Sequence, residues 1–336
     1  MALTLDIARR ELRLKSPFRI AGHVFDTSPI VTVTLSDGIH RGRGEASGVF
    51  FLHDDVDHMV ATLETTAAHT KTVGSRADLR EVLPPGGARN ALDCALWDLE
   101  AKRAGTPVWK LAGLGPPRPL RTTFTIGADA PAAMAETAKS YIQAKSIKVK
   151  LTGDVDLDIA RVEKIRAARP DVWLGVDGNQ GFTRTGLEAL LPALARLDVR
   201  LVEQPLARGH DAELEGIASP IPLAGDESIV SLDDVPGAVG RFDVINIKLD
   251  KCGGLTEGLM MAAEARRLGL GVMVGTMVGT SLATAPGFLL GQVTDLVDLD
   301  GPTFLTEDVS PSVVYDGGTV WAGPEVWGSP AAAPAT

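Results

Sequence analysis

Three carboxylates, Asp177, Glu203 and Asp226, each stand just after a short apolar run, in the sequences VDGN, VEQP and GDES. If these runs are neighbouring parallel strands, their carboxyl ends bring the three side chains into one small volume. Like charges that close together cannot all stay ionised without a cation. Oxygen ligands with no His or Cys nearby favour Mg²⁺, or Mn²⁺, over Zn²⁺. We therefore expect these residues to hold Mg²⁺ and to leave positions for water and substrate oxygens.

Two lysines follow other apolar runs. Lys150 lies near the end of the second of eight such runs and Lys248 follows the sixth, so a closed ring of strands would place them on roughly opposite sides of a bound substrate. A neutral lysine on one face could accept a proton while the opposite lysine donates one, which predicts a racemase with two bases. Lys148 shares a strand face with Lys150 by the two-residue period, and we expect it to contact a substrate carboxylate.

Further polar residues accompany these groups. Asn179 and Glu227 are expected beside the ligands, with Glu227 acting either as a partner of Lys248 or as a helix cap. Asp298 and Asp300, in the sequence DLDGP, share one face of the last run. All of these groups would lie at the same end of the strands.

The elements that must position these side chains are eight short apolar runs that start about 25 residues apart, each followed by a loop and a helical pattern. Such spacing favours an α/β fold, a (β/α)8 (TIM) barrel, over the alternative of a doubly wound open sheet. The runs cover residues 122–126, 147–151, 173–176, 200–202, 221–224, 244–247, 271–274 and 296–299.

The residues before the barrel have a different pattern. Residues 4–14 and 30–35 alternate like antiparallel strands, residues 88–104 have helical periodicity, and GPPRP at 115–119 suggests a joint. These patterns predict an α+β first domain, and the family resemblance described below implies that it is a capping domain that contributes substrate loops near residues 19–26 and 48–55. The predicted division is 1–115 for the capping domain, 116–303 for the barrel and 304–336 for a segment that returns to the capping domain.

Composition limits the possible partners. The 336 residues include 43 acidic and 33 basic side chains, a net charge of -10, which disfavours nucleic acid and anionic membranes as partners. The uncharged stretch from 268 to 294 is rich in glycine, so we interpret it as a strand, a loop and a helix rather than a membrane span. The start of the chain has no signal-peptide pattern, and Cys94 and Cys252 form no CxxC pair. We expect a cytoplasmic enzyme that acts on a small molecule.

The sequences KVK, VDGN, VEQP, GDES and NIKLDKCGG, in this order, resemble those of the enolase superfamily in its muconate-lactonising branch. The resemblance implies a capping domain over a modified barrel, with Asp177, Glu203 and Asp226 as metal ligands. It also implies that Lys150 and Lys248 remove and return the α-proton of a carboxylate substrate through an enediolate. A homo-oligomer is a further expectation from this resemblance.

Within that branch the chain resembles dipeptide epimerases, in which a DxD pair such as Asp298 and Asp300 holds the free ammonium group of the substrate. The segments ARNALDCALWDLEAKRAG and VMVGTMVGTSLATAP resemble neighbouring N-acetyl-glutamate racemases, so an N-acyl amino acid is the alternative substrate. Glutamate-specific dipeptide epimerases carry an arginine where this chain has His23, and the loop GVFFLH at 48–53 is apolar. These features suggest a less polar substrate side chain. The other expected substrate contacts are His23, Phe51, His53, Thr125, Thr276 and Met277.

Other classes of function use the same groups. A cycloisomerase or dehydratase, which is a lyase on a carboxylate substrate, shares the first step of proton abstraction next to a carboxylate. A metal-binding scaffold without catalysis would have no use for opposed lysines.

Overall fold

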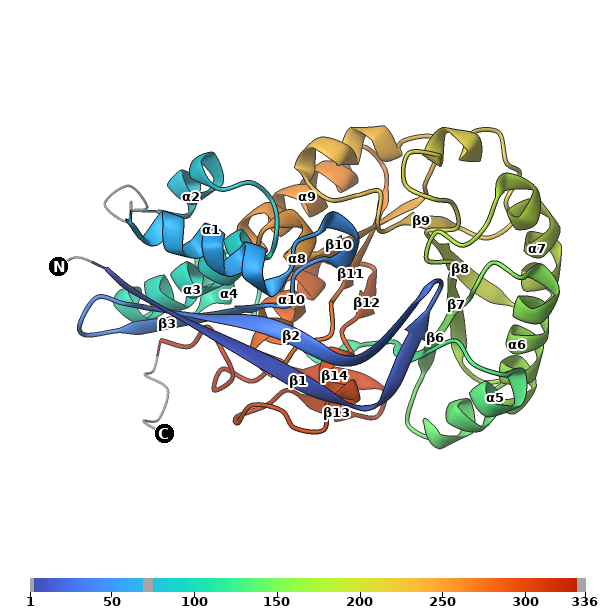
Figure 1. The fold of residues 1–336 in the computed structure, drawn as a ribbon, viewed down its shortest axis with the longest axis horizontal. Coiled ribbons are helices and arrows are strands. Elements are labelled where there is room, and N and C mark those ends of the chain that lie inside the picture. Colours follow the sequence, from blue (N-terminus) through green and yellow to red (C-terminus); the bar gives the residue numbers. More distant parts are fainter. Residues whose placement is uncertain (1–2, 69–74, 331–336) are drawn as a thin grey trace.

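The structure is a computed structural model, and we describe residues 3–68 and 75–330. Figure 1 shows an antiparallel sheet covered by helices beside a ring of parallel strands. The first part consists of β1 (Thr4–Ile20), β2 (His23–Ser36), β3 (Arg41–Ala46), η1 (Phe50–Leu52), α1 (Val56–Ala68), α2 (Arg76–Val82), α3 (Gly87–Ala104) and α4 (Val108–Leu111).

Helix α3 packs directly on strand β3. A Cβ on Gly44 would lie 2.0 Å from the carbonyl oxygen of Ala91, and one on Gly42 would lie 2.0 Å from that of Ala95. Only glycine permits this approach of helix and strand. The alternation expected for residues 30–35 is present, because Val33 and its neighbours two residues away are buried in the core of this part. The predicted α+β capping domain is therefore confirmed in architecture.

The first two strands are longer than the sequence predicts. They form a hairpin whose tip extends past the sheet toward the barrel, near β6 in Figure 1. Strand β1 continues through Pro17, and the pairing with β2 shifts register between Arg13 and Phe18. The hairpin is attached to the barrel by a hydrogen bond from the amide of Ala128 to the carbonyl of Arg19, at 2.9 Å. The capping sheet thus places its tip over the ends of the barrel strands.

The second part is an eight-stranded parallel sheet in the order β12-β11-β10-β9-β8-β7-β6-β5. The amide of Thr123 donates to the carbonyl of Val297 at 3.0 Å, which links the start of β5 to β12 and completes the ring. The predicted modified barrel is confirmed. Its strands are β5 (Phe124–Ile126), β6 (Ser146–Lys150), β7 (Trp173–Asp177), β8 (Val199–Glu203), β9 (Leu223–Gly225), β10 (Val244–Lys248), β11 (Gly271–Gly275) and β12 (Leu296–Asp298).

The connections between these strands are not uniform. Most strands are followed by an α-helix, but β8 and β9 are followed by the short 3-10 helices η2 and η3, and η3 contains Pro236. The helical connections are α5 (Pro131–Ser140), α6 (Val155–Ala168), α7 (Arg184–Arg196), η2 (Asp211–Leu214), η3 (Leu232–Ala238), α8 (Leu249–Cys252), α9 (Leu255–Arg267), α10 (Ser281–Leu290) and η4 (Gly291–Val293).

The residues after β12 contact both parts of the molecule. Helix η5 (Gly301–Phe304) is followed by a hairpin of β13 (Val314–Asp316) and β14 (Thr319–Trp321), and β14 pairs with β4 (Leu120–Arg121) beside the barrel. Farther along, the amide of Gly328 donates to Asp98 on α3 at 3.1 Å. The predicted segment 304–336 includes 331–336, which lie outside the described residues. Its assignment to the capping domain stays a prediction, as do the other domain boundaries.

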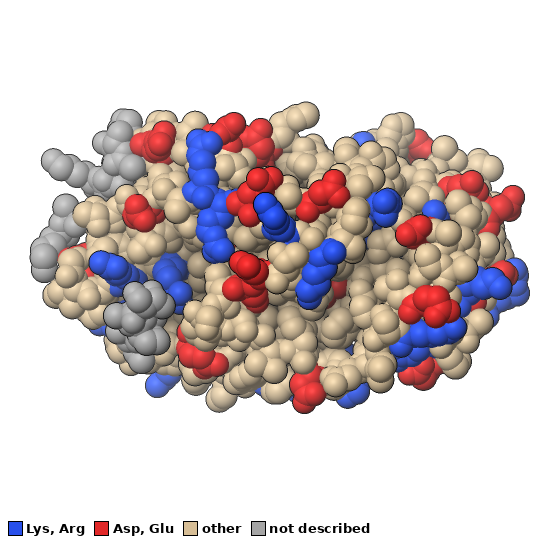
Figure 2. Space-filling model, turned by 60° about the horizontal axis from the view of Figure 1, so that its bottom comes forward, with Lys and Arg blue, Asp and Glu red and all other residues tan. Residues whose placement is uncertain are grey.

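The surface carries both acidic and basic side chains, as the composition leads one to expect. On the face shown in Figure 2, acidic and basic side chains are interspersed. Among the residues that the structure describes, no helix is both long enough and apolar enough to cross a membrane. The glycine-rich stretch 268–294 contains strand β11 and helix α10, as predicted.

Candidate active site at the carboxyl ends of the barrel strands

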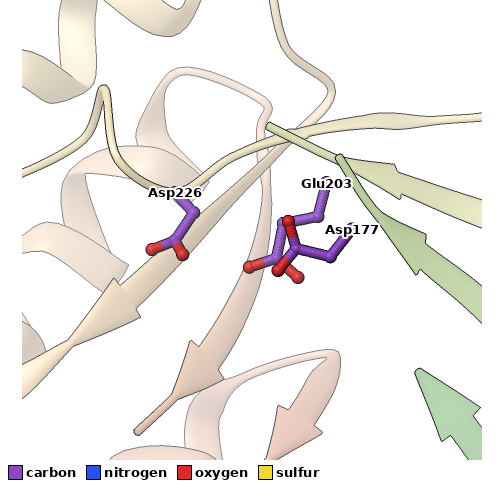
Figure 3. Close-up of side chains that lie close together, drawn as sticks. All are labelled: Asp177, Glu203 and Asp226. Atoms are coloured by element: carbon purple, nitrogen blue, oxygen red, sulfur yellow. The ribbon is translucent and has the colours of Figure 1, made fainter. Parts of the chain in front are cut away.

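Three carboxylates gather at one end of the barrel. Asp177 is the last residue of β7, Glu203 is the last residue of β8, and Asp226 directly follows β9. One oxygen from each lies within 4.8 Å of the others, and all three side chains are buried. Figure 3 shows the three side chains extending from neighbouring strands toward a shared space. The arrangement brings together the three residues that the sequence singles out as metal ligands.

Residues that the sequence analysis missed hold these carboxylates in place. Asn246 Nδ2 donates to Glu203 Oε1 at 2.7 Å, and Lys251 Nζ donates to Asp226 Oδ1 at 2.6 Å. Asn246 precedes Lys248 by two residues, so the strand period was the available signal that both face the same side. Lys251 belongs to the same KLDK sequence, but only the tertiary structure shows that its side chain returns to Asp226.

The two candidate catalytic lysines bind different carboxylates of the triad. Lys150 Nζ lies 2.6 Å from Asp177 Oδ2, and Lys248 Nζ lies 2.6 Å from Asp226 Oδ2. Lys150 ends β6 and Lys248 ends β10, and three strands separate β6 from β10 in either direction around the ring. The two amines therefore approach the carboxylates from separate parts of the barrel wall.

Lys148 is surrounded by negative charge. Its Nζ contacts Asp298, lies 3.1 Å from Glu203 Oε2 and lies 3.9 Å from Asp177 Oδ2. Burial disfavours the charged amine, but these three carboxylates together raise its pKa well above the ordinary value. Lys148 thus carries a fixed positive charge at the base of the site.

Three buried oxygens of the site accept no hydrogen bond from the described residues. Glu203 Oε2, Glu227 Oε2 and Asn179 Oδ1 are buried and accept no hydrogen bond, although Lys148 forms an ion pair with Glu203 Oε2. Burial, with Asp177 adding to it, raises the pKa of Glu203 to about 7, and burial with Asp226 raises that of Glu227 to about 8. Asn179 Nδ2 donates to Glu227 Oε1 at 3.2 Å. Hard oxygen donors in excess of nearby positive charge are suited to a divalent cation.

The two aspartates of DLDGP differ in their surroundings. Asp298 accepts hydrogen bonds from Thr123 Oγ1 and Lys148 Nζ, whereas Asp300 accepts one from the amide of Thr125 at 2.5 Å. Burial raises the pKa of Asp300 to about 7, and the charge of Asp298 adds to this effect. The charge of Lys148 opposes this increase in part, but among the described residues Asp300, unlike Asp298, forms no salt bridge.

A cavity of about 500 Å³ lies between the strand ends and the capping domain, and its lining includes Lys150, Asp226 and Lys248 but not Asp177 or Glu203. The predicted substrate contacts Phe51, Thr125, Thr276 and Met277 lie in its wall, as do Lys148, Asp298 and Asp300. His23 and His53 are exposed and do not belong to the described lining. The ring of His23 packs against Phe50, with centroids 4.7 Å apart. The roles assigned to all of these residues stay predictions.

Family models match both parts of the chain. Residues 133–322 match the model described as "Enolase C-terminal domain-like", and residues 2–113 match "Mandelate racemase / muconate lactonizing enzyme, N-terminal domain". The chain belongs to the mandelate racemase/muconate lactonizing enzyme family of the enolase superfamily. This confirms the superfamily and the branch predicted from the motifs.

The chain is similar over most of its length to relatives within the mandelate racemase/muconate lactonizing enzyme family. It is 37% identical over 317 residues to the L-Ala-D/L-Glu epimerase of Escherichia coli strain K12, covering 94% of this chain and 98% of that protein. It is 41% identical over 242 residues to the N-acetyl-D-glutamate racemase of a Pseudoalteromonas species, covering 72% and 76%.

A solved structure matches over nearly its full length. It is the crystal structure of an enolase family member from Agrobacterium tumefaciens with homology to dipeptide epimerases, described with bound sodium and L-Ala-L-Glu. That protein is 40% identical, the match covers 97% of this chain and 100% of the other, and the TM-score is 0.93. The similarity therefore extends to the capping domain as well as to the barrel.

Proposed function

We propose that this chain is a Mg²⁺-dependent epimerase that inverts the Cα of a dipeptide by two-base proton transfer. The observation that carries the proposal is the placement of Lys150 and Lys248, which end strands on opposing parts of the ring and bind different carboxylates of one triad. The relatives named as an L-Ala-D/L-Glu epimerase and an N-acetyl-D-glutamate racemase support an isomerase that acts on amino acid derivatives.

The donor set supports Mg²⁺ as the cation, with Asp177, Glu203 and Asp226 as the residues that would hold it. Three carboxylates without His or Cys suit a hard cation that keeps several oxygen ligands from water or substrate. When bound, the cation supplies positive charge to the substrate carboxylate as the α-proton leaves. Mn²⁺ offers the same chemistry and stays an alternative.

The lysines perform the proton transfer. The neutral amine of one lysine accepts the proton from Cα, and the electron pair of the C–H bond moves into the adjacent carboxylate group. The ammonium group of the opposite lysine then donates a proton to the other face of Cα, so configuration inverts and no atom is gained or lost. Lys148 would place positive charge beside the substrate carboxylate throughout.

The amino nitrogen of the substrate distinguishes the two leading candidates. Asp298 and Asp300 both line the cavity, and Asp300 forms no salt bridge among the described residues, which favours a free ammonium group and thus a dipeptide. An N-acyl amino acid is the second candidate because of the 41% identity to a racemase of that class. A homo-oligomeric state and a cytoplasmic location stay predictions.

A pooled exchange experiment tests the proposal. The enzyme is incubated with Mg²⁺ in deuterated buffer with a library of L,L-dipeptides and N-acetyl amino acids, and each compound is followed by mass and by chiral chromatography. The proposal predicts a gain of one mass unit together with inversion in dipeptides. Exchange confined to N-acetyl amino acids would support the second candidate instead.

Other outcomes contradict both candidates. Loss of water or ammonia, or a change of connectivity without inversion, would identify a lyase or a cycloisomerase. Complete absence of exchange across the library would favour a metal-binding scaffold. Because Lys164 is exposed on α6, the variant Lys164→Ala is the matched control for substitutions of the candidate catalytic lysines.

A further inference from the structure

The half of the cavity formed by the capping domain is aromatic and apolar. Its wall is built from the β1–β2 hairpin and from η1, both of which extend over the strand ends. The apolar residues in this wall are Leu14, Phe18, Ile20, Val24, Phe25, Pro29, Phe50 and Phe51.

The aromatic rings in this half are packed against one another and only half-buried. Phe25 and Phe50 have ring centroids 5.4 Å apart, and Phe50 and Phe51 have centroids 5.4 Å apart at an interplanar angle of 89°. The ring of Phe18 on β1 has its centroid 4.9 Å from that of Phe304 on η5. Edge-to-face packing of this kind is a stable arrangement that leaves other ring surfaces open to a further apolar group.

Positive charge is confined to the opposite half of the cavity. Among the described residues, the lining contains no arginine, and its only lysines are Lys148, Lys150 and Lys248. Each of these is ion-paired to a carboxylate at the strand ends. The charged residues that the capping domain adds to the wall, Asp26 and Asp55 among them, are acidic.

From this distribution we infer that the substrate residue whose Cα is inverted carries an aromatic or other large apolar side chain. The inference rests on the proposed function, which places the substrate carboxylate at the strand ends and so directs the side chain toward the capping domain. A glutamate side chain would bury a carboxylate there without a cationic partner, which is unfavourable. A phenyl ring would instead cover exposed aromatic surface.

One arginine, Arg208, lies close to the cavity but outside its lining. The guanidinium carbon of Arg208 lies 6.0 Å from the ring centroid of Phe51, and Arg208 is exposed. Its side chain is thus close to a residue of the cavity wall, although Arg208 is not part of the lining. The experiment therefore includes a variant of this residue.

The first measurement uses the wild-type enzyme with Mg²⁺ and two matched pairs of compounds. These are L-Ala-L-Phe with L-Ala-L-Glu, and N-acetyl-L-Phe with N-acetyl-L-Glu, each followed by deuterium uptake at Cα. The enzyme should act on at least one of these two pairs. Within that pair, we expect kcat/KM for the phenylalanine compound to exceed that for the glutamate compound by at least about tenfold. The N-acetyl pair keeps the inference testable if the substrate nitrogen is acylated.

The second measurement uses Phe25→Arg, which adds a cation to the aromatic wall. We expect the ratio of kcat/KM for the phenylalanine compound to kcat/KM for the glutamate compound to fall by at least about tenfold. Ile142→Arg adds the same charge at a residue that is 84% exposed, and this control should leave the ratio unchanged. If Phe25→Arg does not fold, the preference of the wild-type enzyme between the phenylalanine and glutamate compounds alone tests the inference.

Two results would overturn the inference while leaving the proposed function intact. One is a wild-type preference for the glutamate member. The other is a selective loss of activity on the glutamate member in Arg208→Gln, because Arg208 would then supply the cation that the lining lacks. Absence of exchange with all four compounds and with the wider dipeptide library would instead remove the proposed function, and this inference with it.

Discussion

Lys251 fixes one oxygen of Asp226: its Nζ donates to Oδ1 over 2.6 Å, and the lysine side chain is completely buried. It also donates to the carbonyl oxygen of Asn246 at 3.0 Å. Lys248 binds the other oxygen of the same carboxylate. Although burial opposes ionisation of Asp226, these two amines together hold its pKa well below the ordinary value. Lys251 is thus a positioning residue for the candidate ligand Asp226.

Replacing Lys251 by methionine is expected to destabilise the metal-free enzyme. The change leaves buried negative charge without one of its two cations, a loss typically of about 3 to 5 kcal/mol. Urea unfolding in the presence of EDTA measures it, with Lys164→Met as the exposed control. Addition of Mg²⁺ should recover more stability in Lys251→Met than in the wild type, because a cation at the triad replaces the missing charge. A variant as stable as the wild type in EDTA would contradict this role.

Substitutions of the two candidate bases, Lys150 and Lys248, should impair proton transfer on opposite faces of Cα. Lys150→Ala and Lys248→Ala should each slow epimerisation by about 10²- to 10⁴-fold, since general acid-base groups contribute that much. Each variant should still exchange the α-proton of one diastereomer of the dipeptide, and the diastereomer that exchanges should differ between the two variants. Proton NMR of the Cα signal in deuterated buffer, run separately on the two diastereomers of an accepted dipeptide, measures this. Exchange of the same diastereomer in both variants would show that the lysines share one face.

The placement of the site was predictable because its residues end strands. Lys150, Asp177, Glu203 and Lys248 are each the last residue of a barrel strand, and in parallel sheets polar groups at those ends face one common region. An apolar run followed by a charged residue is visible in the sequence alone. The eight runs and their order were therefore predictable as well.

Contacts that depend on how segments dock were not predictable. Pro17 lacks an amide hydrogen and suggests the end of a strand, yet β1 continues past it because the pairing changes register there. The contact of Lys251 with Asp226 and the aromatic packing of Phe25 on Phe50 also join separate elements. Nothing in the local spacing of these residues specifies such long-range contacts.

Asp300 provides a test of the substrate nitrogen. The variant Asp300→Asn keeps an acceptor for the amide of Thr125 but removes the negative charge proposed to bind a free ammonium group. We expect kcat/KM for an accepted dipeptide to fall by at least about tenfold, because a charge-assisted hydrogen bond is lost. Activity on an N-acetyl amino acid, if the wild type has it, should change little. Equal losses on both classes would show that Asp300 does not act on the ammonium group.

Glu45 joins the capping domain to the barrel through a contact that depends on pH. Its Oε1 accepts from the amide of Thr280 at 2.7 Å and its Oε2 accepts from Thr280 Oγ1 at 2.6 Å, at the start of α10. Burial raises the pKa of Glu45 from 4.5 to about 7 against these two hydrogen bonds; nearby Asp250 adds to the increase and Arg10 opposes it. The folded protein therefore holds a proton here that the unfolded chain releases at lower pH.

The direction in which pH changes the stability follows from the number of protons that Glu45 binds in the folded and unfolded states. Between pH 4.5 and about 7 the folded state binds more protons at Glu45 than the unfolded state, so its contribution to stability falls as pH rises and is lost above that range. A shift of this size corresponds to about 3 kcal/mol. Glu45→Gln cannot ionise, and its amide can still bond to Thr280. Its unfolding free energy should match that of the wild type near pH 4 and exceed it near pH 8, by urea titration with the exposed variant Glu64→Gln as control. The same difference at both pH values would contradict the linkage.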